Sequence, residues 1–91
     1  MLFETVKGEV LKIVDVNVFD MKVTHIGLAS TSKFKEIERI YIAEIENPEL
    51  ENLVKARKIN DIEKKLVGKK VRCSVISRDG FGRLTARVKV I

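Results

Sequence analysis

The sequence predicts a mainly β fold with one helix, arranged as a five-stranded Greek-key barrel of the OB type. Two observations favour it: apolar and polar residues alternate in stretches near both ends of the chain, and one well-delimited helical segment lies between them. The 91 residues suit a single domain, 1–91, with no room for a second hydrophobic core. Periodicity alone leaves an unrelated α+β sandwich open.

Three β segments are expected before the helix. Residues 6–14 are rich in Val, Leu and Ile, and residues 19–24 alternate apolar with polar side chains, as on a half-buried strand. Small and hydroxyl residues over 27–32 predict a turn. A third strand is expected over about 34–45.

The helical segment carries clear start and stop signals. Asn47 can cap it, and Pro48 fits the first helical position. Apolar residues at spacings of three and four continue to residue 66, and Gly68 supplies the stop. Asn60 followed by Glu63 resembles a second capping box, which predicts a bend or a restart of the helix there.

Two further strands are expected after the helix. Apolar and polar residues alternate again over 71–75 and 84–90. Between them the Asp79-Gly80 step is a strong hairpin signal. Three strands, a helix and a hairpin form the order that suits a small Greek-key barrel of the OB type.

Composition limits the classes of function. No apolar run is long enough to span a bilayer, the first residues lack the features of a signal peptide, and the single cysteine excludes an internal disulfide. We therefore expect a cytoplasmic protein without membrane association. The absence of Gln and the abundance of Lys, Glu and Ile are typical of thermophile proteins.

The positive charge is concentrated near the end of the sequence. From residue 69 onward there are seven basic residues and one acid, so this segment is more positive than the whole chain at +5. Such asymmetry indicates a polyanion-binding face or, equally, the solvated sides of two strands. The candidate nucleic-acid-binding residues are Lys69, Lys70, Arg72, Arg78, Phe81, Arg83 and Arg87, with Phe81 available either to stack on a base or to plug the barrel end.

Three segments resemble motifs of the staphylococcal nuclease-like family, in that family's order. Residues 68–71 followed by 78–86 resemble its helix stop, strand and "D-x-[YF]-G-R-L-x-A" hairpin. Residues 45–49 are similar to its "[IV]-D-x-P-E" strand-to-helix junction, and residues 14–18 are weakly similar to its "D-G-D-T" segment. The resemblance covers most of the chain and implies a staphylococcal nuclease-like barrel.

The resemblance also implies a catalytic set. Members of this family hold calcium against the scissile phosphate of DNA or RNA, with two arginines stabilising the charge and a glutamate assisting water. By this resemblance, Arg83 stands at one arginine and Glu49 at the glutamate. Glu46 and Asn17 stand where two metal-binding aspartates are usual, so calcium is the implied cofactor.

Departures from the family pattern weaken that set. Asn17 removes one negative charge from the implied metal site. Tyr41 stands where the second arginine is expected, and loss of one preorganised charge stabiliser typically costs on the order of 10²–10³ in rate. Arg39, two residues earlier on the same face of a regular strand, is a candidate replacement.

Three functions follow as expectations. The first is single-stranded nucleic-acid binding on the basic face of the barrel, with phosphodiesterase activity weak or lost. The alternatives are a working calcium-dependent nuclease acting on single-stranded DNA or RNA, and a protein-interaction module on the same scaffold. The family usually continues into a further helix after the fifth strand, so a homo-oligomer or a larger protein partner is also expected to cover apolar surface.

Overall fold

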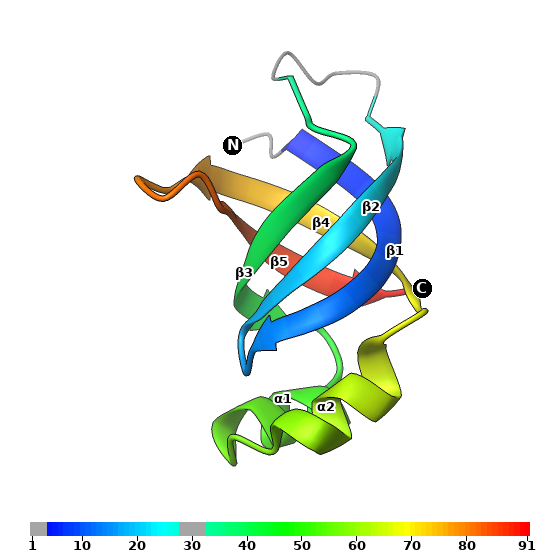
Figure 1. Ribbon diagram of the computed structural model, residues 1–91, viewed down its shortest axis with the longest axis vertical. Helices are drawn as coiled ribbons and strands as arrows, with labels where there is room; N and C mark the ends of the chain where they lie inside the picture. The colour runs from blue at the N-terminus through cyan, green and yellow to red at the C-terminus, as the bar shows by residue number, and fades with distance from the viewer. Residues whose placement is uncertain (1–3, 28–32) are drawn as a thin grey trace.

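The computed structural model describes residues 4–27 and 33–91, which form a closed five-stranded barrel with two short helices (Figure 1). The elements in chain order are β1 (Glu4–Asp15), β2 (Val18–Ile26), β3 (Ile37–Ile45), α1 (Pro48–Lys55), α2 (Ile59–Leu66), β4 (Lys70–Arg78) and β5 (Leu84–Val90). The prediction of a mainly β, five-stranded barrel is confirmed. No helix in the described part of the chain is long and apolar enough to cross a membrane.

The order of strands around the barrel is β1-β2-β3-β5-β4, and β4 closes the barrel by pairing with β1. β3 and β5 run parallel, whereas the other four neighbouring pairs are antiparallel. The connection from β3 to β4 passes through both helices. This arrangement is consistent with an OB-type barrel.

β1 can pair along its length with two neighbours because it coils around the barrel. Its register with β2 shifts between Lys7 and Gly8 and again further along. Gly8 faces inward at the first of these shifts, where an added Cβ would lie 2.5 Å from the Cγ of Met21. A residue without a side chain is therefore required at this close approach.

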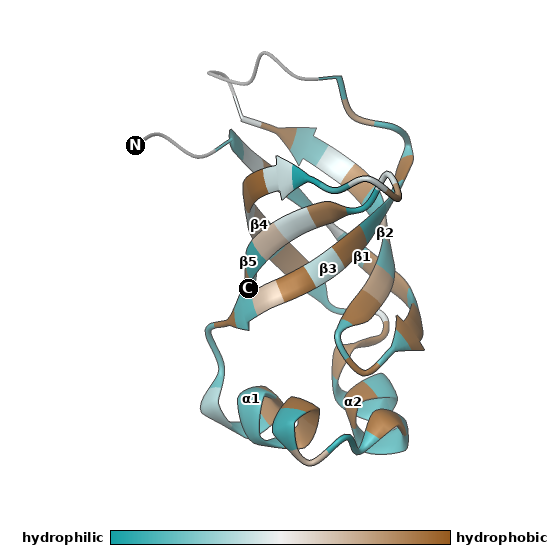
Figure 2. Ribbon diagram, turned by 90° about the vertical axis from the view of Figure 1, so that its left-hand side faces the viewer, coloured by the Kyte–Doolittle hydropathy of each residue, from teal (hydrophilic) through white to brown (hydrophobic). Residues whose placement is uncertain are grey.

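Alternation along the strands divides core from surface, as the sequence predicts. The inward faces supply a core that includes Phe19, Met21 and Ile40, all with 0% of their surface exposed. The two helices lie across one end of the barrel (Figure 1), where Ile62 and Leu66 join the same core. Colouring by hydropathy shows apolar and polar bands alternating along the strands (Figure 2).

The prediction of a single helix is wrong, because the segment contains two helices, α1 and α2. α1 ends at Lys55, and Arg57 adopts the left-handed conformation with φ 56°. The N–H of Arg57 donates to the carbonyl of Val54 and that of Lys58 to the carbonyl of Leu53, the pair of bonds of a Schellman motif. The chain then restarts at Ile59, which places the break before the expected position at Asn60.

Other boundaries agree more closely with expectation. The Asn47 side chain caps α1 by accepting from the N–H of Leu50 at 3.0 Å, and Pro48 is its first residue. The Asp79-Gly80 hairpin joins β4 to β5. β3 begins at Ile37 and not near residue 34, and most of the turn expected over 27–32 lies outside the described residues.

Candidate nucleic-acid interface

The outer face of β3 meets the β4–β5 hairpin at a cluster of one arginine and two aromatic rings. Alternation along β3 turns Tyr41 outward, and its parallel neighbour on β5 is Thr85. The guanidinium of Arg83 lies over the ring of Tyr41, 5.1 Å from its centroid, and 5.3 Å from the centroid of the Phe81 ring. Both distances are within the range of cation–π attraction. Phe81 is 87% exposed, so the hairpin presents an aromatic face to solvent.

Asp79 organises the hairpin that carries this cluster. Its carboxylate accepts hydrogen bonds from the backbone N–H groups of Phe81 and Arg83, each at 2.9 Å, and from Arg83 Nε at 2.6 Å. Burial alone would raise the pKa of Asp79, but these bonds and the charge of Arg83 outweigh it and lower that pKa. Arg83 is thus held in place through Nε, and within residues 4–27 and 33–91 its two terminal nitrogens form no hydrogen bond.

Arg78 braces the base of the hairpin. Its guanidinium donates through Nη1 and Nη2 to Glu38, at 3.2 and 2.9 Å, and through Nη1 to the carbonyl of Gly82 at 2.8 Å. Glu38 is 1% exposed and also accepts from the backbone N–H of Lys35. The hydrogen bond to Glu38 raises the pKa of Arg78. Arg78, a candidate nucleic-acid contact from sequence, is therefore occupied in joining β3, β4 and the hairpin.

A second arginine lies on the same outer face, beside the cluster. Arg39 shares the outward side of β3 with Tyr41, as the alternation predicts. Its guanidinium donates to both carboxylate oxygens of Asp20 on β2, at 2.9 and 3.3 Å, and Asp20 is also 3.8 Å from Lys12 Nζ. The hydrogen bond and the charge of Asp20 raise the pKa of Arg39. A pocket of about 280 Å³ separates this pair from Phe81 and Arg83.

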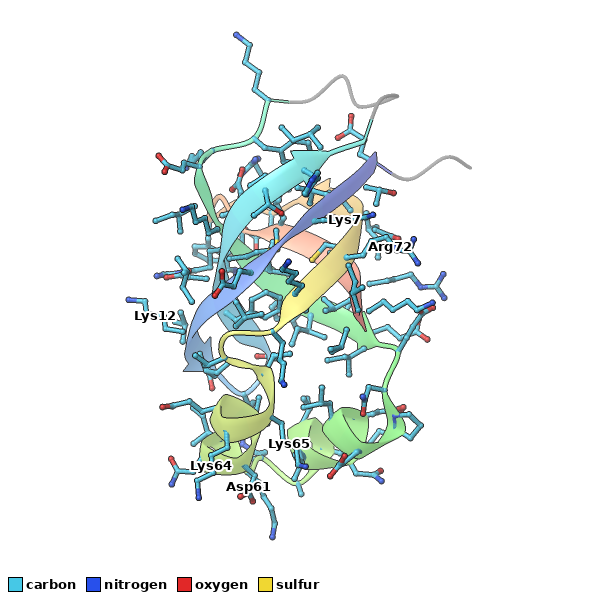
Figure 3. All side chains as sticks on the ribbon, turned by 90° about the vertical axis from the view of Figure 1, so that its right-hand side faces the viewer. Lys7, Lys12, Asp61, Lys64, Lys65 and Arg72 are labelled. Carbon is cyan, nitrogen blue, oxygen red and sulfur yellow. The ribbon has the colours of Figure 1, made fainter. Side chains whose placement is uncertain are left out.

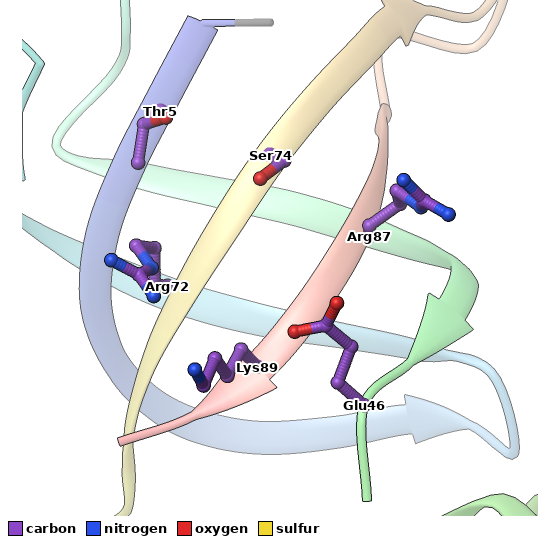
Figure 4. A pocket seen from close by; sticks show the side chains of 6 residues that line it. All are labelled: Thr5, Glu46, Arg72, Ser74, Arg87 and Lys89. Atoms are coloured by element: carbon purple, nitrogen blue, oxygen red, sulfur yellow. The ribbon is translucent and has the colours of Figure 1, made fainter.

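The remaining basic candidates lie elsewhere on the barrel. Arg72 on β4 and Arg87 on β5 line a groove of about 340 Å³ together with Thr5, Glu46, Ser74 and Lys89 (Figure 4). Lys70 is paired in register with Glu9 of β1, and Lys69 lies at the junction of α2 and β4, where its backbone bonds Val10 and Leu66. The basic candidates from sequence are thus divided between two faces.

The residues of the implied nuclease set are similarly divided. Arg83 and Tyr41 are together, but Glu49 forms an ion pair with Lys65 of α2. Asn17 lies in the β1–β2 turn, where its backbone carbonyl accepts from the N–H of Ile42. Glu46 lies in the groove that contains three cationic side chains.

The surroundings of Glu46 do not fit calcium, which prefers six to eight oxygen ligands and repels neighbouring cations. Across residues 4–27 and 33–91, no three His, Cys, Asp or Glu side chains gather into a set that could hold a metal ion.

Sequence reasoning missed three residues of the groove, Thr5, Ser74 and Lys89. Alternation over 71–75 and 84–90 already places Ser74 and Lys89 on the outward sides of two strands that the Asp79-Gly80 signal joins. No local signal pairs β4 with β1, which brings Thr5 beside Ser74. Comparisons of the chain with family models, with curated proteins and with solved structures find no match.

Proposed function

We propose that this protein binds single-stranded nucleic acid across β3 and the β4–β5 hairpin. The observation that carries the proposal is the Arg83 guanidinium lying over Tyr41 and beside the exposed ring of Phe81. Proteins that bind single strands combine cationic side chains with aromatic rings on which bases stack. OB-type barrels use this face and the β4–β5 loop for oligonucleotides. The chain's net charge of +5 favours a polyanion as ligand.

Each residue of the cluster has a separate role in this proposal. Phe81, at 87% exposure, offers a base the ring face that Arg83 does not cover. Arg83 can direct its terminal nitrogens to a phosphate, since charge-assisted bonds from a guanidinium suit phosphate oxygens. Tyr41 fixes the plane of Arg83 and offers a second ring. The hairpin is preorganised by Asp79 and Arg78, which reduces the entropy lost on binding.

We infer binding with little or no phosphodiester cleavage. The position of Arg83 beside β3 supports the finer inference that the barrel is of the staphylococcal nuclease-like type. However, the other implied catalytic residues have different partners: Glu49 pairs with Lys65, and Glu46 lies among cations. Glu38 shares a pocket with Arg83 but is bound to Arg78, and Asp79 is bound to Arg83 itself. With these carboxylates engaged, the arginine supports recognition of a phosphate more than attack on it.

Tyr41 gives a direct assay, because it is the single tyrosine of a chain without tryptophan. Titration with oligothymidylate at low salt is expected to quench its fluorescence as the strand occupies the face. Phe81→Ala is expected to lose the stacking of one base, about 1–3 kcal/mol, and so to bind roughly 5- to 150-fold more weakly. Ile91→Ala, an exposed apolar residue at the far end of β5 from the hairpin, is the matched control.

The same experiment separates the competing functions. Equal affinities for wild type, Phe81→Ala and the control, or no quenching of Tyr41, would overturn the proposal. An oligonucleotide affinity that does not change with salt concentration would favour a protein-interaction module, because phosphate contacts make affinity fall as salt concentration rises. Cleavage of the oligonucleotide that needs calcium and is lost in Arg83→Ala would instead establish a nuclease.

A further inference from the structure

The outer face of β1, β4 and β5 carries two rows of polar side chains that run across the three strands. Register places Thr5, Ser74 and Arg87 opposite one another in the first row. Lys7, Arg72 and Lys89 form the second row, which we call the cation row. Neighbouring strands lie about 4.8 Å apart, so the cation row extends across about 10 Å of surface.

The cation row is electrostatically unfavourable by itself. Like charges directly opposite on neighbouring strands repel, and this row contains two such pairs, Lys7 with Arg72 and Arg72 with Lys89. Within the described residues, none of the three forms an ion pair, although seven other basic side chains there do. A bound anion would remove this repulsion.

The groove beside the row supplies further groups that suit an oxyanion. Figure 4 shows Thr5, Ser74, Arg72 and Lys89 around one hollow, with the Glu46 carboxylate over β5 between Arg87 and Lys89. The hydroxyls of Thr5 and Ser74 can donate to oxygen, and Arg72 and Lys89 supply charge. Arg87 is partly occupied, since its Nε donates to Glu44 at 2.9 Å. Glu46, two residues before α1, adds one carboxylate to the lining, against the positive charges of Arg72, Arg87 and Lys89.

Among the residues that the structure describes, no aromatic side chain lines this groove, in contrast to the face that carries Phe81. The described lining consists of charged side chains and hydroxyl donors and includes no ring on which a base could stack. Such a surface suits the phosphodiester backbone and is indifferent to the bases. The two faces therefore offer different contacts to the same class of ligand.

We propose that the groove with Thr5, Ser74, Arg72 and Lys89 is a second phosphate site, which binds the nucleic-acid backbone independently of the bases. The ligand class agrees with the function proposed above, but the site requires neither Phe81 nor Arg83. Either site can therefore be present when the other fails. A free phosphate group is the other source of the same chemistry, and the test distinguishes the two.

The test uses a fluorescently labelled abasic oligomer, a deoxyribose-phosphate chain without bases. Wild type is expected to bind it at low salt, and the Arg72→Gln/Lys89→Gln variant to bind at least about tenfold more weakly. The slope of log affinity against log salt should fall by about 1.4, since each contact with a single strand contributes about 0.7. The control, Lys58→Gln/Lys64→Gln, removes the same charge from the helices, where Lys64 lies far from Lys7 and Arg72 (Figure 3).

Each outcome is decisive for the site. Equal binding of the abasic oligomer by the Arg72→Gln/Lys89→Gln variant and wild type would overturn it, as would no binding by wild type at low salt. A weakened abasic interaction in the folded variant supports it, with folding checked by circular dichroism. Both side chains face solvent and repel their neighbours, so the unliganded variant should melt at a temperature equal to or above that of wild type at low salt.

Two further measurements identify whether the phosphate is free or part of a backbone, and distinguish this proposal from the function proposed above. Displacement of the abasic oligomer by inorganic phosphate or thymidine monophosphate would indicate that the groove takes isolated phosphates, whereas resistance to both would indicate a continuous backbone. Phe81→Ala should weaken oligothymidylate binding and leave abasic binding unchanged. If the proposal for the aromatic face alone is wrong, Phe81→Ala leaves oligothymidylate binding unchanged while Arg72→Gln/Lys89→Gln still weakens abasic binding. If the proposal for the groove alone is wrong, Arg72→Gln/Lys89→Gln leaves abasic binding unchanged while Phe81→Ala still weakens oligothymidylate binding.

Discussion

Replacing Arg78 with alanine leaves the buried Glu38 carboxylate without the guanidinium that faces it. Glu38 is 1% exposed and receives two hydrogen bonds from Arg78. Breaking a fully buried ion pair costs about 3–5 kcal/mol. The Arg78 side chain is 36% exposed, so water screens part of the interaction, and we expect a loss of about 2–3 kcal/mol in the free energy of unfolding.

That loss is large for a domain of this size. At about 0.05–0.15 kcal/mol per residue, the whole chain has roughly 5–13 kcal/mol of stability. A loss of about 2–3 kcal/mol should lower the melting temperature by about 8–24 °C. Thermal and urea unfolding followed by far-ultraviolet circular dichroism would measure both quantities without requiring tryptophan.

A second arginine–glutamate pair provides the matched control. Arg87 donates through Nε to Glu44 at 2.9 Å, but the two side chains are 48% and 55% exposed. Arg87→Ala should therefore cost less than about 1 kcal/mol. The double variant Glu38→Leu/Arg78→Leu removes both charges and should recover much of the stability that Arg78→Ala loses. The reasoning is refuted if Arg78→Ala costs no more than Arg87→Ala, or if the double variant is no more stable than Arg78→Ala.

Three further predictions concern acid, thiol chemistry and backbone packing. Asp79 has a lowered pKa, so its contribution to the stability of the hairpin is complete above the ordinary pKa of 3.8 and is lost as pH falls through the lowered pKa. Tyr41 fluorescence should therefore stay constant down to about pH 4, and a change near neutral pH would contradict this. Burial raises the pKa of Cys73 to about 12, so a thiol reagent at about pH 8 should label it slowly in the native protein and rapidly after denaturation, whereas rapid native labelling would count against it. Gly8→Ala should lower the free energy of unfolding by about 2–3 kcal/mol, because the added Cβ lies against Met21. Gly80→Ala, where space is open, should leave that free energy nearly unchanged, and urea unfolding measures both. Equal effects of the two substitutions would show that β1 shifts to accommodate a side chain at Gly8.

The strands and the start of α1 were predictable because their signals are local. One-sided burial imposes alternation on β3, β4 and β5. The Asn47 side chain caps α1 by accepting from the N–H of Leu50, only three residues further along the chain. The break after α1 was not predictable in the same way. A left-handed residue at that position is usually glycine, and Arg57 gives no such signal.

The candidate site was harder to predict because it depends on pairing between distant strands. Arg72, Arg78 and Arg83 lie close together in sequence, yet they face a groove, a buried carboxylate and an aromatic ring, respectively. The partner of Arg78, Glu38, lies on β3, forty residues earlier. The charge bias towards the end of the sequence was real, but register decides which charges remain available to a ligand.

β5 connects the two proposed binding surfaces. Its outward residues are Thr85, Arg87 and Lys89; Thr85 is the neighbour of Tyr41, while Lys89 belongs to the cation row. From Thr85 to Lys89 the strand rises about 13 Å, so under the two proposals a nucleic-acid strand of a few nucleotides that leaves Arg83 along β5 would reach Arg72. Binding at the second surface then becomes intramolecular, and the affinity for a long strand can exceed that of either surface without any new contact. A small closed barrel can in this way separate contact with bases from contact with phosphates and still hold one strand with both.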